Sequence, residues 1–232
     1  MKRFSFIVLA LVMLFAFTAC GENEVTTTDK DNDEYSFDFS EIMIGDMVNK
    51  GDAFDMHATY YAYINIIDYG TITVKLDQSQ APITVQNFVD LATSGFYNGL
   101  TFHRIMEGFM MQGGDPNGNG TGGSNKKIVG EFKANGYNNT ISHVRGVISM
   151  ARAGYSYDSA SSQFFIMHED YTGLDGQYAA FGYVTEGMNV VDKVCTTVKP
   201  IDNNGTIPSY AQPVINKIVI SKVVEATADT AA

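Results

Sequence analysis

The amino-acid sequence predicts a mainly β protein, an antiparallel barrel or sandwich with two short helices. Short apolar runs recur from residue 59 onwards, and residues that favour turns separate them. Only two stretches show helical spacing, and they do not alternate with the strands as they would in a parallel α/β fold. The composition agrees, because 22 glycines, 13 tyrosines and 15 phenylalanines in 232 residues favour strands joined by tight turns.

The first predicted strands form a β-hairpin over 59–76. Apolar and polar side chains alternate over 59–68 and again over 71–76, and Tyr69-Gly70 supplies the turn between them. Later strands are expected where short apolar runs occur, at 101–105, 109–112, 146–150, 163–167, 179–184 and about 214–223.

Two segments predict helices. The first begins at Pro82, which suits the first turn of a helix, and ends near Gly95; its apolar residues Val85, Phe88, Val89 and Ala92 share one face. The second lies near 188–195, with Val190, Val191, Val194 and Cys195 on one face. Cys195 is therefore expected to be a small core residue with no disulfide partner.

The first twenty residues resemble a bacterial lipoprotein signal. Lys2 and Arg3 precede an apolar run over 4–17, too short to span a bilayer comfortably. Small residues then precede Cys20, which would be lipidated and become the first mature residue. Phe17 departs from the aliphatic residue usual there, and secretion with cleavage near Ala19 or an uncleaved anchor are the alternatives. We expect an extracytoplasmic bacterial lipoprotein, held on the periplasmic or cell-surface side of a membrane by its lipid.

The rest of the chain divides by composition into a tether, a domain and a tail. Residues 21 to about 40 are polar and acidic, and 41–58 have no clear pattern, so 21–58 is expected to be a tether with an unassigned segment before the domain. The domain is expected over 59–223, followed by a tail at 224–232. The net charge of −11, with no basic stripe, argues against nucleic acid as a partner.

Common catalytic signatures fail on their context. The pattern Gly118-x-Gly120-x-x-Gly123 matches the dinucleotide fingerprint, but no strand precedes it and no apolar helix follows it, so a glycine-rich turn is the better interpretation. The four histidines do not have metal-ligand spacing, and no Gly-x-Ser-x-Gly elbow occurs. No metal or cofactor is therefore expected.

Several sequence blocks carry a more specific signal. They are FHRIMEGFMMQGGD at 102–115, GTGG at 120–123, SMARAG at 149–154, SQFFI at 162–166, LDG at 174–176, and FG at 181–182 followed by EGM at 186–188. In their order and spacing, over about 59–223, they resemble the cyclophilin family of peptidyl-prolyl isomerases. The resemblance implies a closed eight-stranded antiparallel barrel capped by two α-helices, with a groove that takes an X-Pro segment of a polypeptide.

The resemblance also implies that Arg104 is the catalytic residue, and the chemistry is consistent with this. Rotation about the X-Pro amide has a barrier of roughly 18–20 kcal/mol, and at the twisted transition state the prolyl nitrogen regains a lone pair. A guanidinium is always protonated and can donate to that nitrogen without a covalent step. On strand period, Phe102, Arg104 and Met106 would share one face, so Arg104 need not be a core residue. A solvated strand arginine is the alternative.

The remaining site residues are carried over from the family motifs. Phe109, Met110, Phe165 and Leu174 match the apolar pocket for the proline ring, and Tyr178 matches its edge. Gln112 and Gln163 are expected to hydrogen-bond the substrate backbone, with a structural link between strands as the alternative for Gln163. Ala151 and Arg152 match a strand edge that contacts the residue before proline.

Two positions depart from the family pattern. Gly173 stands where several relatives carry a tryptophan that contacts cyclosporin, so binding of that drug is expected to be weak. Glu107 replaces the usual proline before Gly108-Phe109. Two other functions stay open at this stage: a module that holds proline-containing segments without turnover, and a secreted glycan- or nucleotide-binding β-barrel.

Overall fold

The computed structural model describes residues 37–224. The predicted lipoprotein signal, Cys20, the acidic stretch up to residue 36 and residues 225–232 lie outside the described residues. The described strands are β1 (Asp46–Met47), β2 (Ala58–Ile66), β3 (Gly70–Leu76), β4 (Thr101–Met106), β5 (Met110–Asp115), β6 (Val147–Met150), β7 (Phe164–Met167), β8 (Ala180–Glu186) and β9 (Ile215–Val224). The α-helices are α1 (Pro82–Thr93) and α2 (Met188–Thr197), and short 3-10 helices cover Lys133–Asn135, Thr172–Leu174 and Ser209–Ala211.

The predicted elements agree closely with these bounds. The hairpin over 59–76 is confirmed as β2 and β3, the later apolar runs as β4 to β9, and the two helical segments as α1 and α2. Val190, Val191, Val194 and Cys195 form the buried face of α2, as expected. Burial raises the pKa of the Cys195 thiol to about 12, so it behaves as a small core residue. Neither helix between residues 37 and 224 is long and apolar enough to cross a bilayer.

The expectation of a closed, eight-stranded barrel is wrong in both respects. Over the described residues the sheet has nine strands in the order β1-β9-β2-β3-β8-β6-β7-β5-β4, and no ladder joins its two ends. Isolated bridges, Thr101 to Val214 and Arg104 to Thr206, connect β4 to the segment before β9. The Phe102 N–H donates to the Pro213 carbonyl. Because proline has no N–H, it cannot donate a second hydrogen bond across to β4, and a continuous ladder between β4 and this segment is interrupted.

The extra strand comes from the segment that the sequence left unassigned. β1 pairs with the outer edge of β9, so that Asp46 lies opposite Lys222. Just before it, Phe39 packs with Tyr63 and Val219 in a small apolar cluster. Tyr63 is fully buried, and its hydroxyl accepts the Ile44 N–H at 2.6 Å. The segment from residue 39 to residue 48 is thus fastened to the sheet by both apolar contact and hydrogen bonds.

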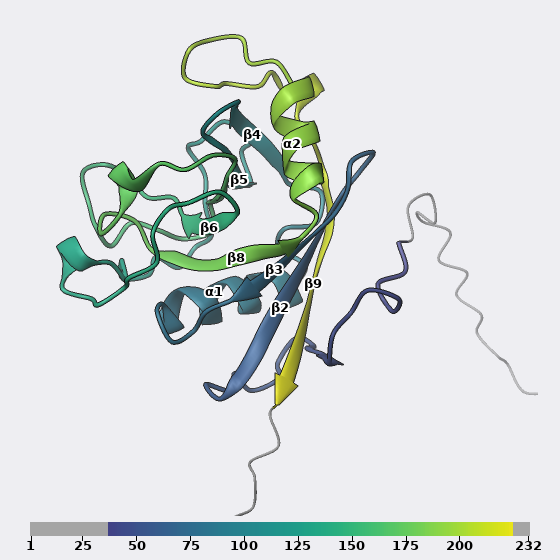
Figure 1. Ribbon diagram of the computed structural model, residues 1–232, viewed down its shortest axis with the longest axis vertical. Helices are drawn as coiled ribbons and strands as arrows, with labels where there is room; N and C mark the ends of the chain where they lie inside the picture. The colour runs from purple at the N-terminus through teal and green to yellow at the C-terminus, as the bar shows by residue number, and fades with distance from the viewer. Residues whose placement is uncertain (1–36, 225–232) are drawn as a thin grey trace, which may run out of the picture. The chain divides into compact units, whose positions relative to one another are not determined.

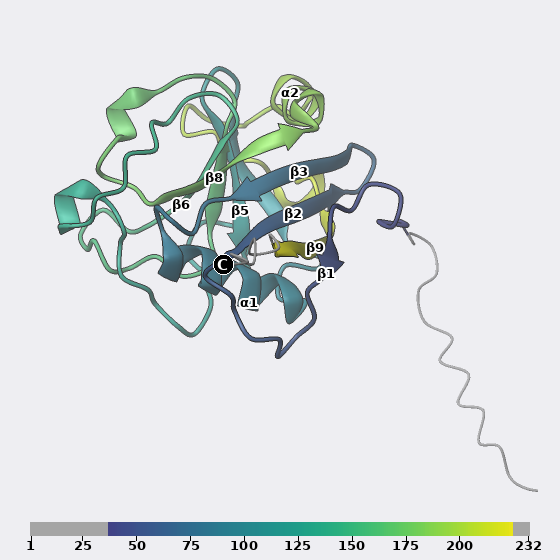
Figure 2. The same ribbon diagram turned by 60° about the horizontal axis from the view of Figure 1, so that its bottom comes forward.

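The two helices lie at opposite ends of the sheet (Figures 1 and 2). α1 packs on β9, and α2 packs on β3 and β5. Phe88 of α1 enters an aromatic cluster with Tyr97, Phe164 and Phe181, at centroid distances of 5.3–5.5 Å. Phe164 makes an edge-to-face contact with Phe88, the geometry that aromatic quadrupoles favour. These four aromatic residues belong to the main core, and Phe164 brings β7 into it.

We predict that Tyr63→Phe lowers the free energy of unfolding by about 1 kcal/mol, because the Ile44 N–H loses its acceptor. The matched control is Tyr61→Phe, since the Tyr61 hydroxyl makes no hydrogen bond within the described residues. Denaturant unfolding of the full-length variants measures both changes. Equal stability of the two variants would show that the Tyr63 hydroxyl does not fasten this segment.

Candidate functional site

The hairpin of β4 and β5 carries the centre of the site. Arg104 lies directly opposite Gln112, and the guanidinium Nη1 donates to Gln112 Oε1 at 3.3 Å. On its other side, Arg104 Nε donates to the Asn204 carbonyl at 2.7 Å. The Arg104 guanidinium is therefore held between a strand and the loop before β9, while its carbon lies 6.0 Å from the centre of the Phe109 ring.

The strand-period expectation was wrong for one residue of β4. Phe102 lies in the main core together with Ile105, whereas Met106 packs on the smaller cluster that lines the site. The pairing with β5 explains this, because it passes from Phe102 opposite Gly113 to Arg104 opposite Gln112 and skips His103. Such a β-bulge adds one residue and reverses the facing of the residues after it. Arg104 thus faces the site although Phe102 faces the core.

A cavity of about 150 Å³ lies beside Arg104. Its lining contains every predicted catalytic and substrate-binding residue except one: Arg104, Phe109, Met110, Gln112, Ala151, Arg152, Phe165, Leu174 and Tyr178. The structure therefore brings together residues from four separate blocks of the sequence, together with Tyr178. A cavity of this volume can hold a ring the size of benzene, and the five-membered ring of proline is no larger.

The wall of this cavity is an apolar cluster separate from the main core. Met110 and Phe165 are buried in it, and Phe109, Leu174 and Tyr178 pack against them while partly exposed. Met106 also packs against this cluster, and Arg104 Nη2 donates to Met106 Sδ at 3.3 Å. An apolar wall lowers the local dielectric constant, and this strengthens any hydrogen bond that the neighbouring guanidinium makes.

Partial burial lowers the pKa of Arg104, opposed by the nearby Tyr178 and Asp202. An arginine side chain nevertheless stays protonated in proteins, so the site keeps a permanent donor. Asp202 also organises the loop that supplies the Asn204 carbonyl, because its Oδ1 accepts the N–H groups of Asn204 and Thr206, both at 3.0 Å.

Gln163 is the predicted residue that lies beside the cavity rather than in its lining. Its Nε2 donates to the carbonyls of Gly120 and Gly122, and its Oε1 accepts from Gln112 Nε2 at 2.9 Å. Its amide is thus engaged within the protein on both sides, which favours the structural-link alternative. Gln163 lines a second cavity of about 300 Å³, which shares Gln112, Ala151 and Arg152 with the first.

The glycine-rich segment forms a turn, as the sequence predicted, and it borders this second cavity. The Asp115 carboxylate fastens it by accepting N–H groups from Asn117, Asn119 and Gly120. Across the cavity, the Arg152 guanidinium lies over Tyr178, Tyr157 and Phe132 at 4.8, 5.0 and 5.4 Å. These aromatic contacts hold the side chain at the junction of the two cavities.

Two supporting residues were not identified from the sequence. Asn204 contributes only a backbone carbonyl, which any residue could supply. The residue type at this position therefore does not indicate its role. His143 lies fully buried behind the cavity, stacked 6.0 Å from the Phe165 ring. Its Nδ1 lies 2.9 Å from Asp175 Oδ1 and its Nε2 lies 3.0 Å from Ser149 Oγ, so both ring nitrogens are engaged.

The fold and the site together define a peptide-binding domain with an apolar, ring-sized pocket edged by a fixed guanidinium. Residues 61–224 match the family model described as cyclophilin type peptidyl-prolyl cis-trans isomerase/CLD. The chain belongs to this family. Its members catalyse cis-trans isomerisation of X-Pro bonds, and the chain is an enzyme of this class.

Relatives and solved structures agree with this assignment. A peptidyl-prolyl cis-trans isomerase of Helicobacter pylori (strain ATCC 700392 / 26695) is 45% identical over 142 residues, which cover 60% of this chain and 83% of the relative. Peptidyl-prolyl cis-trans isomerase B of Bacillus subtilis (strain 168) is 45% identical over 126 residues, covering 54% and 84%. A Cryptosporidium parvum cyclophilin-type isomerase, crystallised in the presence of the dipeptide Ala-Pro, superposes with a TM-score of 0.61 at 30% identity, covering 69% of this chain and 98% of that one.

We predict that stability falls as the pH drops below about 6.5, the ordinary histidine pKa. Burial lowers the pKa of His143 more than Asp175 raises it, and burial likewise lowers the pKa of His103. In this window the unfolded chain binds more protons than the folded one, so acid favours unfolding, and the stabilising contribution is complete only above the unfolded pKa.

Urea unfolding at a series of pH values between 8 and 5 measures this effect. His143→Asn should have a shallower acid slope than the wild type, because one of these two histidines no longer titrates. A wild-type stability that stays constant from pH 7 to pH 5 would contradict the prediction.

Proposed function

We propose that this isomerase acts on X-Pro bonds of exported proteins and that Arg104 carries the catalysis by donating a hydrogen bond to the prolyl nitrogen. The proline ring enters the cavity of about 150 Å³ against Phe109, Met110 and Phe165. The observation that carries the proposal is the placement of the Arg104 guanidinium at the rim of an apolar, ring-sized cavity.

The mechanism follows from the electronic structure of the amide. In the planar ground states the nitrogen lone pair is delocalised and accepts hydrogen bonds poorly; at the twisted transition state it becomes localised and basic. A donor aimed at the nitrogen therefore stabilises the transition state more than either ground state, which is the requirement for catalysis. Asn204 and Gln112 hold the Arg104 donor in place before substrate binds, so little reorganisation is needed. No covalent intermediate forms.

The second cavity extends the groove for the residues that flank the proline. It adjoins the first through Gln112, Ala151 and Arg152, so an extended peptide can occupy both. The Cryptosporidium parvum isomerase was crystallised in the presence of the dipeptide Ala-Pro, which supports a proline-containing peptide as the ligand class. Weak cyclosporin binding remains a prediction from Gly173, which follows Thr172 in the short helix beside the cavity.

We predict that Arg104→Lys and Arg104→Ala both lower kcat/KM by roughly 10²–10³-fold, the usual cost of removing a transition-state donor. Lysine keeps the charge but lacks the planar fork that Asn204 and Gln112 hold, so it should not rescue activity. A protease-coupled proline-isomerisation assay on the full-length protein, with unfolding curves as a folding control, measures the change.

An Arg104→Ala variant that is folded and as active as the wild type would overturn this role. A wild type that binds proline-containing peptides but isomerises them at the uncatalysed rate would favour the alternative of a binding module.

The location of the enzyme is the second part of the proposal. We infer that Cys20 is lipidated and that the lipid holds the enzyme outside the cytoplasm, on the periplasmic or cell-surface side of a bacterial membrane. The support is the apolar run over 4–17 followed by small residues and a cysteine. An acidic tether after Cys20 would then separate the domain from the membrane surface.

We predict that Cys20→Ala abolishes incorporation of labelled fatty acid and moves the protein from the membrane fraction to the soluble fraction. Cys195→Ala is the matched control and should leave the labelling unchanged, because Cys195 is buried in the core. Labelling that persists in Cys20→Ala would contradict the lipid anchor.

A further inference from the structure

The turn that joins β4 to β5 positions the Phe109 wall of the pocket. Phe109 N–H donates to the Met106 carbonyl at 3.0 Å, and Gly108 has a φ of +78°. A positive φ at the third residue is characteristic of a type II turn, in which proline at the second residue would preset the backbone. Here the second residue is the exposed Glu107. The conformation of this turn must therefore be fixed by something other than proline.

His168 contacts this turn through both its side chain and its backbone. Gly108 N–H donates to His168 Nδ1 at 2.9 Å, and His168 N–H donates to the Phe109 carbonyl at 2.8 Å. His168 directly follows β7, and only 7% of its surface is exposed. It does not line the cavity, yet it holds the two residues that set where the Phe109 ring lies.

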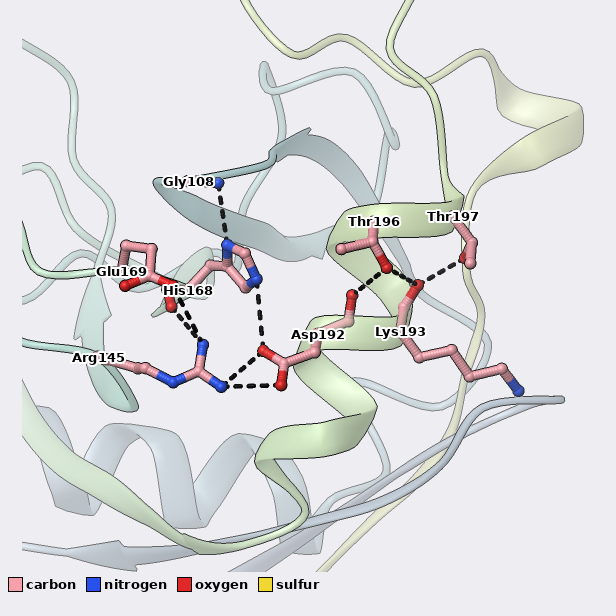
Figure 3. Close-up of polar contacts among 8 residues, drawn as sticks. All are labelled: Gly108, Arg145, His168, Glu169, Asp192, Lys193, Thr196 and Thr197. Atoms are coloured by element: carbon pink, nitrogen blue, oxygen red, sulfur yellow. Dashed lines mark hydrogen bonds and ion pairs between the residues drawn. The ribbon is translucent and has the colours of Figure 1, made fainter.

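A charged network orients the His168 ring (Figure 3). Because Nδ1 accepts from Gly108, the neutral ring carries its proton on Nε2, which lies 3.4 Å from Asp192 Oδ1 on α2. Arg145 Nη2 lies 2.7 Å from the same oxygen and donates to Asp192 Oδ2 at 2.8 Å. Arg145 Nη1 donates to the His168 carbonyl at 2.6 Å. The side chain and backbone of His168 are thus both tied to one network.

We propose that His168 is a positioning residue of the isomerase, which holds the 106–109 turn so that Phe109 stays against Arg104 and the proline pocket. The Arg104 carbon lies 6.0 Å from the Phe109 ring centre, so a shift of this turn alters the cavity wall and the surroundings of the donor together. The inference rests on the proposed role of the Arg104 cavity.

The hydrogen bond from Gly108 requires that Nδ1 of His168 carries no proton. If the ring gained its second proton, that proton would occupy Nδ1 and face the Gly108 N–H. Two donors would then face each other, and the hydrogen bond from Gly108 to His168 would be lost. The positioning role therefore belongs to the ring whose Nδ1 is free of a proton.

Two substitutions separate the hydrogen bond from simple packing. His168→Leu keeps the bulk but removes the acceptor, whereas His168→Asn places Oδ1 near the position of Nδ1 and cannot be protonated. In the full-length protein at pH 8 we expect His168→Leu to lower kcat/KM roughly tenfold, because small displacements of an active-site wall are costly. His168→Asn should recover most of that loss.

Amide hydrogen exchange at Gly108 gives a second measurement that needs no variant. Because Gly108 is exposed, its N–H is expected to owe any protection from exchange to the His168 acceptor, and this protection should be clear at pH 8. Unprotected exchange at pH 8 would overturn the proposal even if His168→Leu fails to fold.

Three activity outcomes separate this inference from the function on which it rests. Full activity of a folded His168→Leu variant, or an equal loss in His168→Asn and His168→Leu, would overturn the positioning role. Full activity of Arg104→Ala would instead overturn the proposed catalytic site. Loss in Arg104→Ala together with loss in His168→Leu and recovery in His168→Asn supports both.

Discussion

The alternation of side chains along β7 is the constraint on which the site depends. Phe164 and Ile166 point into the main core, while Phe165 and Met167 belong to the apolar cluster that lines the pocket. One strand buried on both faces therefore couples the stability of the domain to the shape of the cavity. Phe164 is anchored by Phe88 and Phe102 in the core, so the position of Phe165 is set by packing that never touches substrate.

Around this strand, the guanidinium that we propose to be catalytic is held by segments far apart in the sequence. Arg104 comes from β4, its partner Gln112 from β5, and the carbonyl on its other side from the loop at Asn204. Gln112 in turn donates a hydrogen bond to Gln163, and Gln163 donates to the carbonyl of Gly122 in the glycine-rich turn. A guanidinium fixed on several sides before substrate arrives loses little freedom on binding, which suits a reaction that needs only one well-aimed donor.

The turn at Gly108 links this site to α2 on a different side of the domain. His168 joins the turn to Asp192, and Arg145 joins Asp192 back to the backbone of His168. Behind the pocket, His143 supports Phe165 through ring stacking and is itself engaged by Asp175 and Ser149. Residues outside the cavity lining thus support two of its walls, and each support contains a histidine ring.

The sequence by itself determined the elements and most of the site, because strand alternation and helical spacing are local and the cyclophilin blocks are specific. The tertiary structure decided the rest. The bulge at His103 moved Phe102 into the core, and Pro213 interrupts pairing at a place where the sheet could have closed. No sequence pattern predicts that the Asn204 carbonyl accepts from Arg104 or that the Gly108 N–H donates to His168. Such contacts join backbone groups and distant segments, so only the folded chain brings them together.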